Sequence, residues 1–257
     1  MSFQSKTSWI GLILQSALFI LLPFLILGFL PEIAGIFNVS KPERWIKCFF
    51  GGTGFIVVRL LLIRFKPSIW YFIMTFEHEL THLLAGLLTG KYPKQFWVNS
   101  EDGSGFVLLS GGNMCISLAP YFVPTLPLLV LLVGLFVDAR YEAMLLYIYG
   151  SSLVYHALST WNECHRHQTD IIKVGYAKSI TVLTVANLLL VSSLLMFVGN
   201  GYNGFASYWH QGSKRTVNSI FFAGELTLNF VSKSLTDKPL ASEKKEGIRI
   251  ESNLKKK

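Results

Sequence analysis

The sequence contains little charge. Asp, Glu, Lys and Arg make up 15% of its 257 residues, whereas soluble proteins carry about a quarter. Hydrophobic residues make up 51%, and the mean hydropathy is +0.45. Few soluble folds could bury so much apolar surface, but a bilayer accepts it as solvent. The composition therefore excludes most soluble classes and predicts an integral membrane protein in contact with lipid.

Cysteine is also scarce, and no pattern typical of nucleic-acid binding is present. Cys48, Cys115 and Cys164 are far apart and odd in number, so the sequence predicts no disulfide framework. The formal net charge is +8, but the basic residues lie mostly between apolar runs and in the C-terminal tail. We expect these charges to lie beside anionic lipid, and we expect no nucleic-acid partner.

Six apolar runs are candidate membrane spans. They cover residues 9–30, 48–63, 68–88, 114–137, 141–160 and 180–198. Most are long enough to cross the hydrocarbon core as a helix. The second run is short and carries Arg59, which needs a partner or a route to the membrane surface. We therefore expect an all-α membrane protein, a polytopic bundle of about six transmembrane helices.

A small β-hairpin is expected between the third and fourth runs. Residues 94–99 and 105–110 favour strands and flank a turn that contains Asp-Gly, which is a typical hairpin signal. The segment is rich in glycines that allow close backbone approach, namely Gly103, Gly105, Gly111 and Gly112. It is either an ordinary surface hairpin or an exposed strand edge to which an extended substrate segment can add.

The C-terminal part changes character after residue 199. Residues 220–231 are apolar but too short to span a bilayer, so they form either a strand or a segment on the membrane surface. From Ser242 the chain is highly charged, and such a composition is typical of a disordered tail.

The third run carries polar side chains that are costly in hydrocarbon without a partner. Glu77, His78, Glu79 and His82 lie within two helical turns. On a helix His78 and His82 share one face, so both imidazoles can bind one Zn²⁺ while Glu79 takes a proton from water. The alternatives are polar residues that face a bundle interior, and a cluster that relays protons or ions.

Two histidines are too few for a catalytic zinc, which usually has three protein ligands. The downstream candidates are His156, Glu163, Cys164, His165, His167 and Asp170. The fourth and fifth runs form an out-and-back pair, so residues 160–180 return to the side where the third run ends. His156 is either a ligand at a plausible depth or a hydrogen-bonded interior histidine, and residues 164–167 form either a local metal cluster or a solvated loop.

These features together resemble the site-2 protease family of intramembrane zinc metallopeptidases, in its divergent bacterial-type branch. The resemblance rests on His-Glu-x-x-His within a membrane helix, the glycine-containing hairpin, Ser-Leu-Ala-Pro at residues 117–120, and an Asp after two further runs. It covers about residues 68–198. Asp170 stands in Gln-Thr-Asp-Ile rather than in the family's Asn-Pro-x-x-Asp-Gly, and Thr81 replaces a common glycine.

The resemblance implies one Zn²⁺ per chain, held by His78, His82 and Asp170, with Glu79 as general base and later as general acid. It also implies that the glycine-containing segment, with Gly103, Gly105, Gly111 and Gly112, binds the substrate in an extended form. The implied activity is hydrolysis of a peptide bond within or next to a transmembrane segment of a membrane protein.

The resemblance also suggests how the chain is divided. We expect accessory helices over residues 1–67, a metalloprotease core over 68–198 and a polar tail over 199–257. The alternatives are a transporter or channel-like protein that passes metal or protons through the same cluster, and a non-catalytic relative that binds substrate helices. A transporter would spread polar residues along several runs, and apart from Arg59 the other runs lack them.

Basic residues in short loops predict the orientation in the membrane. One side would hold Lys41, Arg44, Lys47, Lys91, Lys94, Arg166, Lys173 and Lys178. The other side would hold Lys6, Arg64, Lys66 and Arg140, together with the tail. The first group is the larger, so we expect the hairpin and the Asp170 loop to face the cytoplasm.

Overall fold

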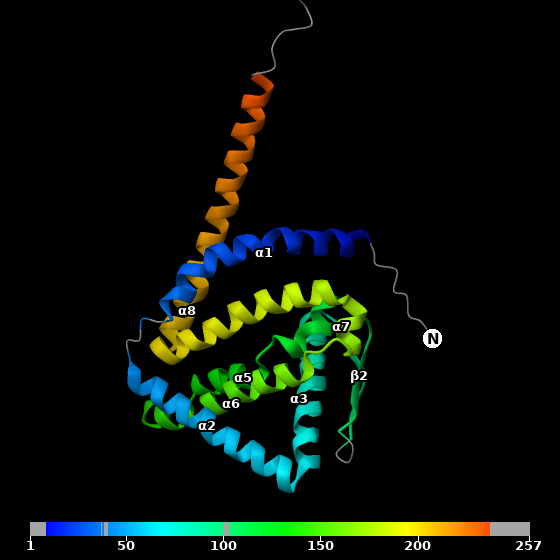
Figure 1. Cartoon of the computed structure of the whole chain (residues 1–257), viewed down its shortest axis with the longest axis vertical. Helices are drawn as coiled ribbons and strands as arrows, with labels where there is room; N and C mark the ends of the chain where they lie inside the picture. The colour runs from blue at the N-terminus through cyan, green and yellow to red at the C-terminus, as the bar shows by residue number, and fades with distance from the viewer. Residues whose placement is uncertain (1–8, 37, 39–40, 100–102, 237–257) are drawn as a thin grey trace, which may run out of the picture. The chain divides into compact units, whose positions relative to one another are not determined.

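The computed structural model describes residues 9–36, 38, 41–99 and 103–236, most of which are helical (Figure 1). The chain divides into two compact units, one of residues Phe29–Gly212 and one that combines Met1–Gly28 with Ser213–Lys257. Two helices pass from one unit into the other, namely α1 (Trp9–Gly35) and α8 (Tyr176–Thr236). The mostly helical class with a small antiparallel hairpin agrees with the sequence expectation.

Two glycines bring α2 (Pro42–Phe65) and α6 (Glu142–Glu163) into backbone contact. A Cβ on Gly51 would collide with the backbone of Tyr147, and a Cβ on Gly150 would collide with that of Cys48. The hydroxyl of Ser151 donates a hydrogen bond of 2.9 Å to the carbonyl of Gly51. Small residues that allow such close packing are typical of helix pairs in membranes.

The expected fourth span, residues 114–137, is not one continuous helix. It is broken into α4 (Met114–Leu118), the short 3-10 helix η1 (Ala119–Tyr121) and α5 (Thr125–Gly134), and its two halves are bent by 79°. Pro120 and Pro124 lie at the break. Proline lacks the backbone N–H that would continue the helix and disfavours helical geometry in the residue before it.

The predicted hairpin is confirmed. Strand β1 (Pro93–Val98) pairs antiparallel with β2 (Gly105–Leu109), with Phe96 opposite Val107. Residues 100–102 of the expected turn lie outside the described residues. The hairpin follows α3 (Pro67–Leu88), which in Figure 1 runs across the direction of α2 and α6.

Of the two alternatives for residues 220–231, the strand is excluded, because these residues are helical and belong to α8. This helix begins at Tyr176, before the expected sixth run, and breaks at Gly201, whose φ of 66° lies in the region that favours glycine. The charged segment after Ser242 lies outside the described residues.

Within the described residues, two helices are long and apolar enough to cross a membrane, namely Pro42–Phe65 and Tyr176–Ser234. The broken pair from Met114 to Gly134 would make a third if it counts as one span. The expected total of six therefore stays a prediction.

The structure separates basic residues that the expected orientation places on one side. Arg44 forms an ion pair with Glu142, which begins α6, whereas Glu163 ends the same helix beside the predicted site. A helix of 22 residues is about 33 Å long. The start of α2, with Lys41, Arg44 and Lys47, therefore lies at the end of α6 away from the predicted site, and the membrane face on which the site lies stays a prediction.

Candidate metal centre

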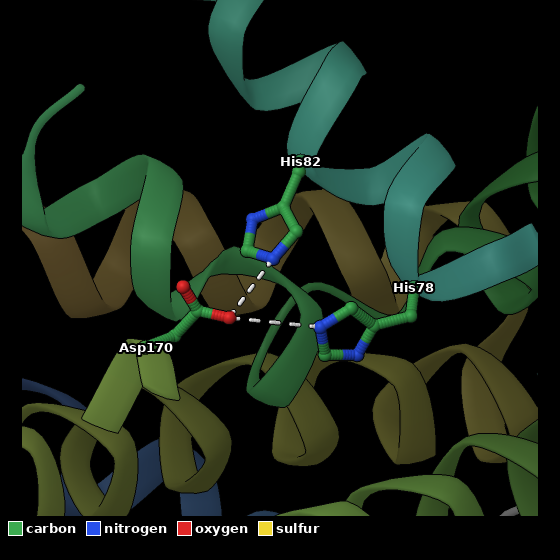
Figure 2. A group of neighbouring side chains, drawn as sticks. All are labelled: His78, His82 and Asp170. Carbon is green, nitrogen blue, oxygen red and sulfur yellow. Dashed lines mark ion pairs between the residues drawn. The ribbon is translucent and has the colours of Figure 1, made fainter. Parts of the chain in front are cut away.

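Three of the predicted site residues come together at one point. His78 and His82 project from α3, and Asp170 projects from α7 (Thr169–Val174) (Figure 2). The Nε2 atom of His82 lies 3.3 Å from Oδ2 of Asp170, and the Nε2 atom of His78 lies 3.8 Å from the same oxygen. One potential ligand atom from each of the three residues lies within 4.8 Å of the other two.

The short helix α7 carries Asp170 back to α3. Ile171 is fully buried and packs with Leu118, Tyr121 and Leu183, which anchors α7 against η1 and α8. Gly175 then ends α7 with a φ of 98°, a value that residues other than glycine rarely adopt. This fold-back allows a residue that follows α6 to reach a histidine in the middle of α3.

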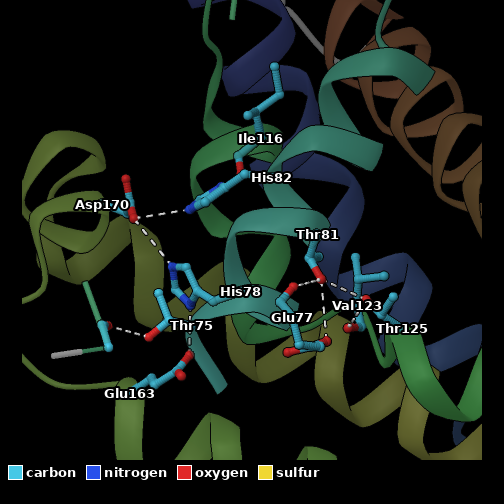
Figure 3. Close-up of polar contacts among 11 residues, drawn as sticks. Thr75, Glu77, His78, Thr81, His82, Ile116, Val123, Thr125, Glu163 and Asp170 are labelled. Carbon is cyan, nitrogen blue, oxygen red and sulfur yellow. Dashed lines mark hydrogen bonds and ion pairs between the residues drawn. The ribbon is translucent and has the colours of Figure 1, made fainter. Parts of the chain in front are cut away.

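The other nitrogen of each imidazole is held by the protein. The Nδ1 atom of His78 lies 2.7 Å from Oε2 of Glu163, and the Nδ1 atom of His82 lies 2.7 Å from the carbonyl oxygen of Ile116 (Figure 3). Both partners accept a hydrogen bond, so we assign the proton to Nδ1 in each ring. Both Nε2 atoms then have a free lone pair, which is the usual arrangement of metal-binding histidines.

Asp170 supplies the negative charge of the cluster. Burial raises the pKa of Asp170, but its contacts with His78 and His82 outweigh this effect, so the pKa lies below its usual range. The Nζ atom of Lys173 lies 3.1 Å from Oδ1 and favours the charged form as well. Two neutral imidazoles and one carboxylate are a ligand set that fits Zn²⁺ and leaves a fourth position open.

Glu79 lies beside these three side chains. Its titratable neighbours are His82, His78 and Asp170, and its carboxylate accepts a hydrogen bond from the backbone N–H of Val107 in β2. The structure thus brings a carboxylate next to the candidate metal ligands without making it part of the ligand group.

The four predicted glycines differ in their surroundings. A Cβ on Gly105 would lie 2.7 Å from Cγ2 of Thr75 and 3.1 Å from Cγ of Glu79, so glycine allows β2 to lie against α3 at Glu79. Gly103 has a φ of 67°, and its carbonyl accepts a 2.5 Å hydrogen bond from Thr75. Gly111 and Gly112 follow β2, and no atom lies within 4 Å of a Cβ placed on Gly112.

A second polar group lies on another face of α3. The hydroxyl of Thr81 donates a 2.8 Å hydrogen bond to the carbonyl of Glu77 and lies 2.7 Å from the hydroxyl of Thr125 (Figure 3). It ties α3 to the start of α5 directly beside His82. Thr81, where the sequence departs from the resembled family, therefore has local partners in this structure.

The remaining candidate ligands lie elsewhere. His156 is buried in α6, and His165 and His167 are exposed. In the described part of the chain, His78, His82 and Asp170 form the one group of three such residues close enough to share a metal ion. Glu163 contacts His78 at Nδ1, the ring nitrogen that faces away from Asp170. Sequence reasoning included Glu163 among the candidate ligands but could not place it as a partner of His78, because that contact joins residues 85 positions apart.

Comparison with protein-family models matches residues 53–198 to a family described as Peptidase M50B-like. The matched region includes α3, the hairpin, α6 and α7. Searches of curated proteins and of solved structures give no match.

Proposed function

The chain belongs to the Peptidase M50B-like family, the site-2 protease family of intramembrane metallopeptidases, and we propose that it is a zinc-dependent endopeptidase that cleaves membrane proteins within or next to a transmembrane segment. One observation carries this proposal. The Nε2 atoms of His78 and His82 face one oxygen of Asp170, with the Glu79 carboxylate alongside.

We assign the metal to His78, His82 and Asp170, with one Zn²⁺ per chain. When bound there, zinc would polarise the scissile carbonyl and make water more acidic. Glu163 and the carbonyl of Ile116 hold the two imidazoles in the tautomer and orientation that binding requires.

Glu79 is the proposed general base and acid. Its carboxylate accepts a proton from water while the water oxygen forms a bond to the carbonyl carbon of the substrate. It then donates that proton to the amide nitrogen as the carbon–nitrogen bond breaks. In the structure the Val107 N–H already donates to this carboxylate, so Glu79 is held at the edge of β2.

The hairpin offers an edge on which a substrate could be held extended. The N–H of Asn99 donates to the carbonyl of Ser104, and the N–H of Ser110 donates to that of Tyr92. In an antiparallel ladder the direction alternates from residue to residue, so Val107 presents its backbone groups to the edge away from β1. A substrate segment that adds to this edge would lie beside Glu79.

This geometry assigns different parts to the four glycines. Gly105 lets β2 approach Glu79, and Gly103 positions the start of β2 against Thr75. Gly111 and Gly112 would allow the chain after β2 to adapt to a bound segment. A transmembrane substrate must be unwound before its peptide bonds are accessible, and pairing with β2 would stabilise that unwound form.

We also propose that α3 and α6 cross the bilayer together with α2, α8 and the broken helix. Each has 22 residues, or about 33 Å, which matches the hydrocarbon thickness. With α1 this makes six spans. The polar residues of α3 are partnered within the protein rather than facing lipid. The cytoplasmic placement of the hairpin remains a prediction.

Metal content and cleavage of the purified full chain test the proposal. We expect close to one Zn²⁺ per chain, and we expect the double variant His78→Ala/His82→Ala to lose it. A panel of single-pass transmembrane segments in phosphatidylcholine vesicles serves as substrate. Chelation should stop cleavage and added zinc should restore it. Cleavage by a zinc-free protein would rule out the assignment, and zinc binding without any cleavage would favour a transporter or a non-catalytic relative.

A further inference from the structure

Tyr121 is a buried side chain beside the candidate metal centre that has no part in the assignments above. It ends η1 at the break between the two halves of the bent helix. Its exposed fraction is 0%, and its backbone carbonyl accepts a 2.9 Å hydrogen bond from Nδ2 of Asn187 in α8. Its place in η1 and its hydrogen bond to α8 therefore fix the position of Tyr121.

The phenol ring packs directly against a proposed metal ligand. The ring centroids of Tyr121 and His78 are 5.4 Å apart, in an edge-to-face arrangement. On another side Tyr121 packs with Ile171, the residue that follows Asp170. The ring thus packs with α3 at His78 and with α7 at Ile171.

The hydroxyl of Tyr121 is buried and has no hydrogen-bond partner among the described residues. Its charged neighbours are the carboxylates of Asp170, Glu163 and Glu79. Burying a hydroxyl without a partner is unfavourable, and phenylalanine would fill the same space without that cost. Packing therefore accounts for the ring but not for the hydroxyl.

Cleavage of a peptide bond at this centre requires a further hydrogen-bond donor. As water adds to the carbonyl carbon, the carbonyl oxygen gains negative charge, and a fixed donor aimed at that oxygen lowers the barrier. The imidazole N–H groups of His78 and His82 are already engaged, and Lys173 is paired with Oδ1 of Asp170. A neutral O–H remains a donor at neutral pH.

We propose that Tyr121 is a further catalytic residue, whose hydroxyl donates a hydrogen bond to the substrate carbonyl oxygen as that oxygen becomes negatively charged. This inference rests on the proposed proteolytic function. It adds a transition-state donor on η1 that neither the His-Glu-x-x-His motif nor the metal ligands specify.

The test compares Tyr121→Phe with the wild type. The substitution removes one oxygen atom and keeps the ring that packs on His78. With a transmembrane segment cleaved by the wild type, we expect kcat to fall roughly 10²-fold while KM stays within about twofold, because the interaction forms in the transition state. Zinc content and zinc affinity should be unchanged.

A second readout does not depend on turnover. Acetohydroxamate chelates zinc through oxygen atoms, so we expect its affinity for the zinc-loaded protein to fall roughly tenfold or more in Tyr121→Phe. The matched control is Tyr208→Phe, which removes the hydroxyl of another fully buried tyrosine. Tyr208 packs on Phe29 and Trp209, so the control should match the wild type in both measurements.

The outcomes separate this inference from the proposed function. Wild-type kcat and acetohydroxamate affinity in Tyr121→Phe would overturn the inference alone. Loss of zinc in Tyr121→Phe would also overturn it, because Tyr121 would then only position His78. A wild-type protein that binds neither zinc nor acetohydroxamate would overturn the proposed function, and this inference with it.

Discussion

Two polar clusters lie at opposite ends of α6, and they differ in where their hydrogen-bonding groups point. At the start of the helix, Arg44 pairs with Glu142 and donates to the carbonyls of Val198 and Phe197, at 2.8 Å and 3.2 Å. Its guanidinium also lies over the ring of Phe197. The donors of Arg44 are thus directed at acceptors of the same chain.

At the other end, the hydrogen-bonding groups converge on a shared point. His78 and His82 use Nδ1 for contacts within the protein and turn Nε2 toward Asp170. Two nitrogens and one carboxylate oxygen with free lone pairs then face one another, an arrangement that a cation stabilises.

The difference shows how to interpret a charged residue within a membrane helix. Such a residue is costly and needs a partner, but backbone carbonyls and side chains of the same protein can serve as that partner. The break at Gly201 leaves helix-end carbonyls without their usual donors, and Arg44 supplies donors to two of them. Convergence of lone pairs, rather than charge alone, therefore distinguishes the candidate metal centre. Four predictions test this comparison, in order of their expected effect on turnover.

The largest effect is expected from Asp170→Ala. Removing the carboxylate leaves two neutral imidazoles, which cannot offset the charge of Zn²⁺ in a site of low dielectric constant, so zinc occupancy and cleavage should both be lost. His156→Ala, which alters a buried histidine outside the cluster, is the matched control and should keep its zinc. Zinc analysis of both variants decides the matter. Full occupancy in Asp170→Ala together with loss in His156→Ala would transfer the ligand role to His156.

Glu79→Gln should abolish most turnover while leaving zinc in place. Glutamine keeps the shape and can still accept the hydrogen bond of Val107, but it cannot take a proton from water. Loss of a general base lowers the rate at least about 10²-fold. The measurements are zinc content and the cleavage rate on the same preparation. Cleavage near the wild-type rate would remove Glu79 from the mechanism and would favour the transport alternative.

The sequence predicted those parts of the centre that depend on local spacing. His78, Glu79 and His82 could be identified because a helix places positions four apart on one face. Asp170 could be proposed from the resemblance and the expected order of the runs. The contacts of Glu163 with His78 and of Val107 with Glu79 could not be predicted, because they join segments that only the tertiary fold brings together.

The errors have physical causes as well. The expected span over residues 114–137 did not take account of two prolines that break the helix. This break places Ile116 and Tyr121 next to the histidines. The orientation count assumed that charges in successive loops alternate between the two sides. Arg44 instead packs with Glu142 and the broken end of a helix in α8.

A smaller effect is expected from Glu163→Gln. The carboxylate behind His78 raises the basicity of that imidazole and fixes its orientation, and loss of such a partner usually lowers metal affinity by about 10–100-fold. Glutamine keeps a carbonyl acceptor for Nδ1–H, so binding should be weakened rather than abolished. Competition with a zinc chelator measures the affinity. Glu142→Gln, at the Arg44 end of the same helix, should leave zinc affinity unchanged. Equal effects of the two variants would mean that the clusters are not independent.

The smallest effect on turnover is expected from Arg44→Met. Methionine fills part of the same space but leaves the carbonyls of Phe197 and Val198 without their donors, at a cost of about 1–3 kcal/mol. The thermal unfolding midpoint in detergent should therefore fall by a few degrees, while zinc affinity and kcat of the folded protein stay at wild-type values. Arg64→Met is the matched control, because Arg64 is exposed in the same helix α2, and its midpoint should change little. If Arg44→Met lowered zinc affinity as strongly as Glu163→Gln does, the Arg44 cluster would be coupled to the metal centre through α6, and the separation between a structural and a catalytic cluster would be wrong.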